Sequence, residues 1–235
     1  MLKKELIPHP SAPWQQQILQ EYLRCTNINK DSHVLDAACG IGNNLNTIKH
    51  FSKNITAFDI SDIPLKYAKQ RHKNVNFFKS NLEEITTQSD MFDIVICTEA
   101  MEHCKSPEKA VHELYRVLKP GGYLILSTQN HMNASALVKF IYETFTKKNW
   151  DAWGTHTLDS SYESYISALK LYRLCKHQGF KKEKLRGADY YNAWLSWVPW
   201  LYQNYKFMDK HPCFLLGKLP IIKFFGMDFF MLSRK

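Results

Sequence analysis

Short apolar runs alternate with segments of helical periodicity along most of this chain. The runs are rich in β-branched and aromatic residues, and their lengths are typical of buried strands. Seven runs predict strands: 34–36, 55–60, 75–78, 92–97, 123–128, 180–185 and 228–233. Helical spacing and capping residues predict four helices: 14–24, 64–71, 107–118 and 160–177, the last with a capping box at Ser160 and Glu163. This alternation predicts an α/β fold, in which a parallel sheet carries helices on both faces.

Small residues join the first predicted strand to the helix that follows it. Asp36 ends the apolar strand, and the loop contains Ala38, Cys39, Gly40 and Gly42. Small residues let the backbone approach a ligand closely, and the carboxyl end of a central strand opens onto the crevice of a parallel sheet. The loop therefore predicts a binding site for a nucleotide-like ligand.

Polar residues follow the next strands in a regular order. Asp59 ends the second strand nineteen residues after Gly40, where a carboxylate can accept hydrogen bonds from a ribose diol. The structural alternative for Asp59 is a cap for the helix after Ile60. Ser80-Asn81-Leu82 follows the third strand, Thr98-Glu99 follows the fourth, and Lys119-Pro120-Gly121-Gly122 precedes the fifth.

This series of motifs, over residues 30–130, resembles the class I S-adenosylmethionine-dependent methyltransferases. The resemblance implies a Rossmann-like, doubly wound sheet of seven strands, mostly parallel with the last strand antiparallel. It also implies S-adenosyl-L-methionine as cofactor and S-adenosyl-L-homocysteine as product. A hydride-transferring Rossmann enzyme is disfavoured, because the loop lacks the full Gly-x-Gly-x-x-Gly spacing.

The resemblance also implies roles for single residues. Asp36 would organise the glycine loop and reach the methionine ammonium, and Asp59 would hold the ribose. Asn81 stands where the family usually has an aspartate that accepts from the adenine amino group, and an amide oxygen can accept the same bond. Ala38 replaces the commoner glycine. The expected cofactor residues are Asp36, Ala38, Cys39, Gly40, Gly42, Asp59, Ile60, Asn81, Leu82 and Thr98.

Glu99, Glu102 and His103 form the most suggestive catalytic cluster, just after the fourth strand. This group, with Gly154-Thr155-His156, resembles the ubiquinone-biosynthesis O-methyltransferases. There the group is linked to a divalent metal that holds a catechol-like hydroxyl, and two carboxylates with an imidazole can bind Mg²⁺. The alternatives are support of the loop and a direct base. The catalytic candidates are His103 and Glu99, with His131 and His156 as further histidines that can face the pocket.

The C-terminal third differs from the rest of the chain in charge. Residues 170–235 contain 13 Lys and Arg against 4 Asp and Glu, whereas residues 1–169 contain 18 of each, so the net charge of +9 comes from the C-terminal part. A solvated basic face is one interpretation, and attraction to an anionic surface or substrate is the other.

A long insert, residues 189–227, separates the last two predicted strands. Eleven of its residues are aromatic: Tyr190, Tyr191, Trp194, Trp197, Trp200, Tyr202, Tyr205, Phe207, Phe214, Phe224 and Phe225. The insert is interpreted as a small helical cap with its own core, a lid over a bulky acceptor, an oligomer interface or a patch at the membrane surface. Trp and Tyr interleaved with Lys suit a boundary between water and lipid.

The chain is expected to form one domain with four functional segments. These are an N-terminal cap segment (1–30), a cofactor-binding core (31–130), a substrate-side connection (131–160) and the aromatic insert (189–227). Six scattered cysteines form no Cys-x-x-Cys pair, which is typical of reduced thiols in a cytoplasmic protein. No signal peptide and no apolar run long enough to span a bilayer is recognised.

The sequence thus predicts a cytoplasmic methyltransferase, which acts on a hydroxyl of a small or lipid-linked metabolite. Quinone precursors, natural-product aromatics and glycan intermediates all fit, and peripheral contact with an anionic membrane is expected through the basic aromatic third. N- or C-methylation of a small molecule is the alternative reaction, and a catalytically silent binding subunit is the alternative to an enzyme. Nucleic acid is disfavoured as a partner, because Thr98-Glu99-Ala100-Met101 is unlike the Asn-Pro-Pro-Tyr motif of base methyltransferases.

Overall fold

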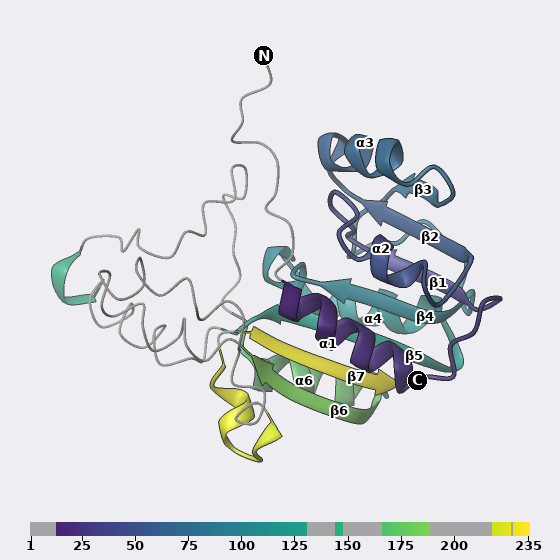
Figure 1. Ribbon diagram of the computed structural model, residues 1–235. Coiled ribbons are helices and arrows are strands. Elements are labelled where there is room, and N and C mark those ends of the chain that lie inside the picture. Colours follow the sequence, from purple (N-terminus) through teal and green to yellow (C-terminus); the bar gives the residue numbers. More distant parts are fainter. Residues whose placement is uncertain (1–12, 131–143, 148–165, 189–217, 227) are drawn as a thin grey trace.

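The computed structural model describes residues 13–130, 144–147, 166–188, 218–226 and 228–235 (Figure 1). In this part of the chain, seven strands form one sheet in the order β3-β2-β1-β4-β5-β7-β6. Strands β1 to β5 are parallel, and β7 runs antiparallel between β5 and β6. The predicted seven-stranded, doubly wound sheet with an antiparallel last strand is therefore confirmed.

The elements alternate along the chain as the apolar pattern predicts. The strands are β1 (His33–Ala37), β2 (Asn54–Asp59), β3 (Asn76–Lys79), β4 (Phe92–Thr98), β5 (Leu118–Gln129), β6 (Lys181–Ala188) and β7 (Asp228–Arg234). The helices are α1 (Pro13–Arg24), α2 (Leu45–Ile48), α3 (Asp62–Arg71), α4 (Pro107–Val117) and α6 (Ala168–Gln178), with short 3-10 turns η2 (Met101–His103) and η6 (Ile222–Phe224).

The start of helix α6 differs from the prediction. The helix begins at Ala168 rather than near residue 160, because Ser167 is extended (φ −100°, ψ 151°). The Ser167 side chain accepts a hydrogen bond from the Lys170 backbone N–H at 3.2 Å and so caps the helix itself. Gly179 ends the helix in the left-handed conformation, as its position predicts. The capping box at Ser160 and Glu163 lies outside the described residues.

Strand β5 also begins earlier than predicted. It starts at Leu118, directly after α4, and carries residues 119–122 as an irregularity between its pairings with Phe92 and Ile94. The Pro-Gly-Gly sequence, which predicts a turn before the strand, is accommodated within it.

Alternate residues of the central strands build two separate cores. Leu35, Val95 and Leu124 belong to the core beneath α4 and α6. Val34, Ile94 and Ile125 belong to the core that includes residues of α1, α2 and α3. Successive strand residues point to opposite faces, so each strand contributes to both layers. Figure 1 shows α1 in front of the sheet and α4 and α6 behind it.

Helix α1 covers one face of the sheet, as its periodicity predicts. Its buried side chains are Trp14, Ile18, Leu19, Tyr22 and Leu23. The Trp14 ring meets the ring of Phe230 on β7 edge to face, with centroids 6.0 Å apart. This packing joins the N-terminal segment to the C-terminal strand.

Two further expectations concern thiols and membranes. Five of the six cysteines lie in the described residues, and all five are free thiols. Among the helices of the described part of the chain, none is long and apolar enough to cross a membrane.

The Asn130 side chain joins three segments at the end of β5. Its amide N–H groups donate to the carbonyl oxygens of Phe224 and Gly226, both at 2.8 Å, and its oxygen accepts from the Ala168 N–H at 3.1 Å. The residue is 1% exposed, so removal of the amide leaves buried polar groups unpaired.

We expect Asn130→Ala to lower the free energy of unfolding by about 3 kcal/mol, measured by urea denaturation. The exposed Asn74 offers a matched control, and Asn74→Ala should stay within about 0.5 kcal/mol of wild type. Equal stability of the two variants would contradict a role of the Asn130 amide in the fold.

Candidate functional site

The strand order places a ligand crevice at the carboxyl ends of β1 and β4. From β1 the chain proceeds to β2 and β3 on one side and then returns to β4 on the other side. Open α/β sheets bind ligands where the strand order reverses in this way. The predicted cofactor residues in the β1 loop and at Thr98 therefore meet at one edge of the sheet.

Three predicted site residues share one face of the sheet. Asp36, Asp59 and Thr98 each lie two residues beyond a strand residue that belongs to the core of α1, α2 and α3: Val34, Ala57 and Ile96. Because side chains alternate along a strand, all three point to the face that α1 and α2 cover.

The glycine loop leaves open space where a ligand would approach. Ala38, Gly40 and Gly42 have φ values of 56°, 53° and 82°, in the left-handed region. A Cβ atom built on Gly40 would meet no atom within 4 Å. Ala38 adopts the left-handed conformation in spite of its methyl group, at a cost of about 1 kcal/mol. The loop therefore tolerates the replacement of the commoner glycine at Ala38.

His72 packs beneath the second glycine of the loop. A Cβ atom on Gly42 would lie 2.9 Å from both the His72 ring and the Leu45 side chain, so this position requires glycine. His72 is buried, and its Nδ1 lies 2.8 Å from Lys49 Nζ. Burial, followed by the positive charges of Lys49 and Arg71, lowers the pKa of His72, so the ring is neutral and accepts from the ammonium group.

Asp36 is the buried carboxylate of the site. Its Oδ1 accepts a hydrogen bond from Asn44 Nδ2 at 3.1 Å, whereas its Oδ2 has no hydrogen-bond partner among the described residues. Burial raises the pKa of Asp36 to about 7; the bond from Asn44 lowers it and the charge of Asp59 raises it. A buried, half-partnered carboxylate favours a cationic ligand, which would supply both charge and donors.

Asp59 holds the backbone of the loop after β1 and of the turn after β2. Its two carboxylate oxygens accept from the N–H groups of Gly40 and Ser61, each at 2.8 Å. Asp59 therefore fixes the turn that precedes α3 and faces the glycine loop, and its contact with the ribose stays a prediction. A carboxylate has about four acceptor positions, so its bonds to the backbone leave room for ribose hydroxyls.

The residues expected around the adenine lie after β2 and β3. Ile60 is 57% exposed and offers an apolar surface beside Asp59, whereas Leu82 is buried. Asn81 is exposed, and its Oδ1 accepts from the Glu83 N–H at 3.0 Å, in a local turn. The second lone pair of this oxygen could still accept a hydrogen bond from the adenine amino group, so this contact stays a prediction.

Asn44 is a site residue that the sequence reasoning missed. It lies directly after the loop, and its Nδ2 donates to Asp36 Oδ1 and, at 2.8 Å, to Thr98 Oγ1. It thereby joins the ends of β1 and β4. An asparagine at the start of a helix usually indicates a cap, and only the tertiary contacts reveal a different role.

Glu99 directly follows the carboxyl end of β4, and its backbone conformation is unusual. Its φ is 51°, in the left-handed region, and its Oε1 accepts from the Ser127 hydroxyl at 2.5 Å. Burial, then the charge of Glu102, raises the pKa of Glu99, against the opposing effects of the Ser127 bond and of His103. A carboxyl with a raised pKa at a sheet edge is a candidate acid or base.

The three residues of the Glu99, Glu102 and His103 cluster do not converge on a metal site. Glu102 is 3% exposed and accepts from the Thr128 hydroxyl at 2.8 Å, while His103 is exposed to solvent. Ser127 and Thr128 are neighbours on β5, and their side chains point to opposite faces of the sheet. Each holds a different glutamate of the cluster, Ser127 holding Glu99 and Thr128 holding Glu102.

The predicted Mg²⁺ site is therefore corrected. Within the part of the chain that the structure describes, no group of three His, Cys, Asp or Glu side chains could hold a metal ion. Glu102 supports the loop against β5, which was the structural alternative for the cluster. His131 and His156, the further catalytic candidates, lie outside the described residues.

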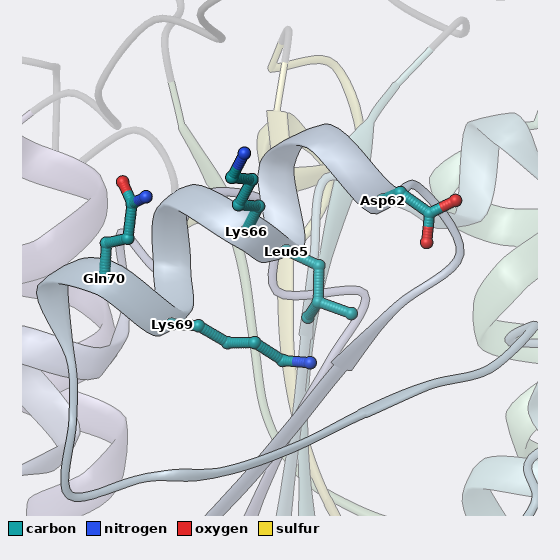
Figure 2. Close-up of a pocket in the computed structure, with 5 residues that line it drawn as sticks. All are labelled: Asp62, Leu65, Lys66, Lys69 and Gln70. Atoms are coloured by element: carbon teal, nitrogen blue, oxygen red, sulfur yellow. The ribbon is translucent and has the colours of Figure 1, made fainter.

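A hollow along α3 contains none of the predicted site residues. It is lined by Asp62, Leu65, Lys66, Lys69 and Gln70, all from one helix, and Figure 2 shows that these side chains point in different directions. Asp62 is already paired with Lys79 at 2.6 Å. The hollow therefore offers no convergent set of polar groups for a ligand.

Comparison with known proteins agrees with this geometry. Residues 35–126 match the family model of the methyltransferase domain. The ubiquinone biosynthesis O-methyltransferase of Rickettsia bellii is 28% identical over 172 residues, which cover 72% of this chain and 69% of the relative.

Two solved structures show the same fold. An S-adenosylmethionine-dependent methyltransferase from Mesorhizobium loti has a TM-score of 0.62 at 15% identity, over 96% of this chain and 98% of its own. The [4+2]-cyclase SpnF has a TM-score of 0.65 at 16% identity, over 97% of this chain and 84% of its own. A shared fold at this level of identity does not by itself define a reaction.

The glycine loop at the switch point and the antiparallel last strand define a class I methyltransferase fold. Together with the methyltransferase domain matched over residues 35–126 and the similarity to the named relative, they support a class I S-adenosylmethionine-dependent methyltransferase. More particularly, its sequence is similar to ubiquinone biosynthesis O-methyltransferases.

The site fits this cofactor. Asp36 Oδ2, which has no hydrogen-bond partner in the described part of the chain, suits the methionine ammonium, and the open space at Gly40 suits close approach of the ligand to the backbone. Asp59 and Ile60 would then hold the ribose and cover the adenine.

The half-partnered carboxylate predicts a pH-dependent stability. Because burial raises the pKa of Asp36 from 3.8 to about 7, the folded protein favours the protonated form. Without ligand, stability should fall as pH rises between these two values and then level off, by a total on the order of a few kcal/mol.

Asp36→Asn removes this titration but keeps the shape of the side chain. We expect the variant to unfold at a higher temperature than wild type near pH 8, to match wild type near pH 4, and to bind S-adenosylhomocysteine more weakly. The exposed Asp31 provides the control, and Asp31→Asn should follow wild type throughout. If the melting temperatures of Asp36→Asn and wild type changed with pH in the same way, the raised pKa of a buried Asp36 would be refuted.

Proposed function

We propose that this methyltransferase transfers the methyl group of S-adenosylmethionine to a hydroxyl oxygen of a small acceptor, and that Glu99 takes up the hydroxyl proton. The proposal rests on the position of Glu99, which follows Thr98 directly at the end of β4, and on the raised pKa of its carboxyl group. Its raised pKa is suited to accept a proton near neutral pH, where general bases act most efficiently.

The cofactor supplies an activated methyl group, and the chain must provide alignment and a place for the proton. A lone pair of the acceptor oxygen forms the new C–O bond while the C–S bond breaks, and the bonding electrons remain on sulfur in S-adenosylhomocysteine. The proton of the acceptor hydroxyl passes to Glu99. Since Ser127 holds Oε1, the second oxygen, Oε2, is the one that can face an acceptor.

The backbone of Glu99 supports the same role. A non-glycine residue in the left-handed region costs on the order of 1 kcal/mol, and such strain is concentrated at functional sites. The Glu99 N–H also donates to the Ser127 carbonyl at 3.0 Å, so the strained residue is fastened to β5 through backbone and side chain alike.

N-methylation of a small molecule is the alternative reaction. A neutral amine can attack the methyl group before it loses a proton, so it needs no base in the step of transfer. A carboxyl with a raised pKa therefore favours a hydroxyl acceptor. The similarity to proteins named O-methyltransferases points in the same direction.

Glu99→Gln tests the proposed base. Glutamine has the shape of the protonated carboxyl, so the fold and the affinity for S-adenosylhomocysteine should be retained. With a catechol such as protocatechuate as probe acceptor, kcat should fall about a hundredfold or more. In wild type kcat should be lost as pH falls through the raised pKa of Glu99, and this dependence should be absent from the variant.

The control is Glu183→Gln, an exposed glutamate on the edge strand β6, which should keep the rate of wild type. Chelation with EDTA should leave the rate unchanged, because the cluster after β4 is not arranged around a metal. A Glu99→Gln variant with the rate and pH profile of wild type would refute the proposed base. Binding of cofactor without methylation of hydroxyl, amine or carbon probes would favour the silent binding subunit.

We further propose that the acceptor is lipid-linked and is reached at an anionic membrane surface. Exposed apolar side chains gather in the segment before β7: Leu219, Ile221, Ile222 and Phe225, with exposed fractions of 44%, 73%, 38% and 46%. Lys218 and Lys223 lie in the same segment, and the basic charge of residues 170–235 complements an anionic bilayer.

The position of this segment supports the proposal. Asp228, the first residue of β7, pairs with Gln129 near the carboxyl end of β5, and Asn130 bonds the carbonyls of Phe224 and Gly226. The apolar segment therefore borders the edge of the sheet at which Glu99 lies.

Ile221→Asp tests the membrane contact. We expect wild type to sediment with phosphatidylglycerol vesicles at low salt, and the variant to bind about tenfold more weakly, since one buried apolar side chain is lost. Met91→Asp changes an exposed apolar residue that precedes β4 at the opposite edge, and should bind as wild type does. Failure of wild type to bind these vesicles, or equal binding by Ile221→Asp, would refute the contact.

A further inference from the structure

Asn44 stands at the N-cap position of α2 but does not cap it. Its backbone is helical (φ −73°, ψ −25°), and its side chain makes no capping hydrogen bond. Asparagine is favoured at helix N-caps because its oxygen accepts from the first free N–H groups. Here the amide turns inward, is 8% exposed, and contacts strands and a distant helix instead.

The amide of Asn44 is engaged on both of its ends. Nδ2 donates one hydrogen to Asp36 Oδ1 at 3.1 Å and the other to Thr98 Oγ1 at 2.8 Å. The oxygen accepts from Gln16 Nε2 of helix α1 at 3.2 Å. The reverse orientation would place the amide oxygen against a carboxylate oxygen, so the contact with Asp36 determines which way the amide points.

Gln16 extends this hydrogen-bond network to α2. Its Oε1 accepts from Thr47 Oγ1 at 2.6 Å, while its Nε2 donates to Asn44. Thr47, Gln16 and Asn44 thus form a continuous path from α2 through α1 to the ends of β1 and β4. Such buried networks hold their members in one arrangement because each broken bond leaves a buried group unpaired.

We propose that Asn44 is a positioning residue of the cofactor site, which holds Asp36 and Thr98 in one geometry and links them to helix α1. This inference rests on the assignment of Asp36 to the methionine ammonium. Because Asn44 occupies Oδ1, the other oxygen of Asp36 is left directed away from Asn44 for the ligand.

Asn44 also affects the charge of Asp36. The bond from Asn44 lowers the pKa of Asp36, against burial and the charge of Asp59 on β2. Among the described residues, the thiols of Cys39 in the loop and Cys97 on β4 also lie near Asp36, and both are neutral because burial raises their pKa values. Without Asn44, Asp36 should ionise only at a higher pH.

Asn44→Leu tests the inference with a readout that does not depend on turnover. Isothermal titration calorimetry with S-adenosylhomocysteine, which carries the same ammonium group, should show an affinity about tenfold to a hundredfold lower than that of wild type. In wild type the affinity should rise with pH up to about 7, where Asp36 ionises, and in Asn44→Leu this rise should move to higher pH.

Three variants separate positioning from general destabilisation. Asn46→Leu makes the same change at an exposed position of α2 and should leave the affinity and its pH dependence unchanged. Thr47→Val breaks the far end of the path, so it should weaken affinity without moving the pH dependence, because the bond to Asp36 remains. In an Asp36→Asn background, Asn44→Leu should have a much smaller effect than it has in wild type.

The outcomes distinguish this inference from the cofactor assignment. If wild type does not bind S-adenosylhomocysteine, the cofactor assignment fails. If wild type binds and Asn44→Leu has the same affinity and pH dependence, the role of Asn44 fails. Thermal melting confirms folding of each variant; if Asn44→Leu is unfolded, Asn44→Ala, which removes the amide without adding bulk, gives the same test. A folded Asn44→Ala protein with wild-type pH dependence would equally overturn the inference.

Discussion

The fully buried carboxylate of Asp36 is the constraint on which the proposed cofactor site depends. The end of β1 lies beneath α1 and α2, so Asp36 is removed from water, and only one of its oxygens finds a hydrogen-bond partner among the described residues. A carboxylate in such surroundings is unfavourable until a cation reaches it. A ligand with an ammonium group would supply both the charge and the hydrogen-bond donors that this carboxylate favours.

The other polar groups of the site lie on the same face of the sheet as this carboxylate, because successive side chains of a strand point to opposite faces. Asp36, Asp59 and Thr98 end three different strands, yet all belong to the face that α1, α2 and α3 cover. Asn44 joins two of these strand ends, and the neutral His72 packs beneath the loop from the other side. Because the strands are rigid and pair with each other in register, the loops after them present their side chains at defined positions.

The fold and the donor site do not define the reaction. A protein named as a [4+2]-cyclase shares this fold, at 16% identity and a TM-score of 0.65. Proteins of this fold differ in the side chains that follow the carboxyl end of β4 and in the segments that face them. In this chain, Glu99 and the exposed apolar segment before β7 lie at that edge. The proposed choice of acceptor rests on these two features.

Local patterns predicted the parts of the molecule that depend on neighbours in the chain. The seven strands, the amphipathic α1 and the glycine loop follow from short-range periodicity and from residues with special backbone preferences. The predicted helix over 160–177 is interrupted at Ser167, because the backbone of this residue is extended and its side chain caps α6, which local sequence spacing does not reveal. The predicted metal cluster finds no support among the described residues, because spacing along the chain does not reveal that separate hydroxyls, of Ser127 and Thr128, hold Glu99 and Glu102.

The sequence by itself thus determined the architecture, the ligand loop and the acidic residues at the strand ends, since each of these has a local signature. Only the tertiary structure decided how those residues are partnered. Gln16, Asn44 and Thr98 are far apart in the chain and carry no motif, yet burial brings their polar groups together and requires each to find a hydrogen bond. Among the described residues, the same burial that forces these bonds leaves one oxygen of Asp36 without a hydrogen-bond partner, and this tertiary consequence suits the loop to a cationic ligand.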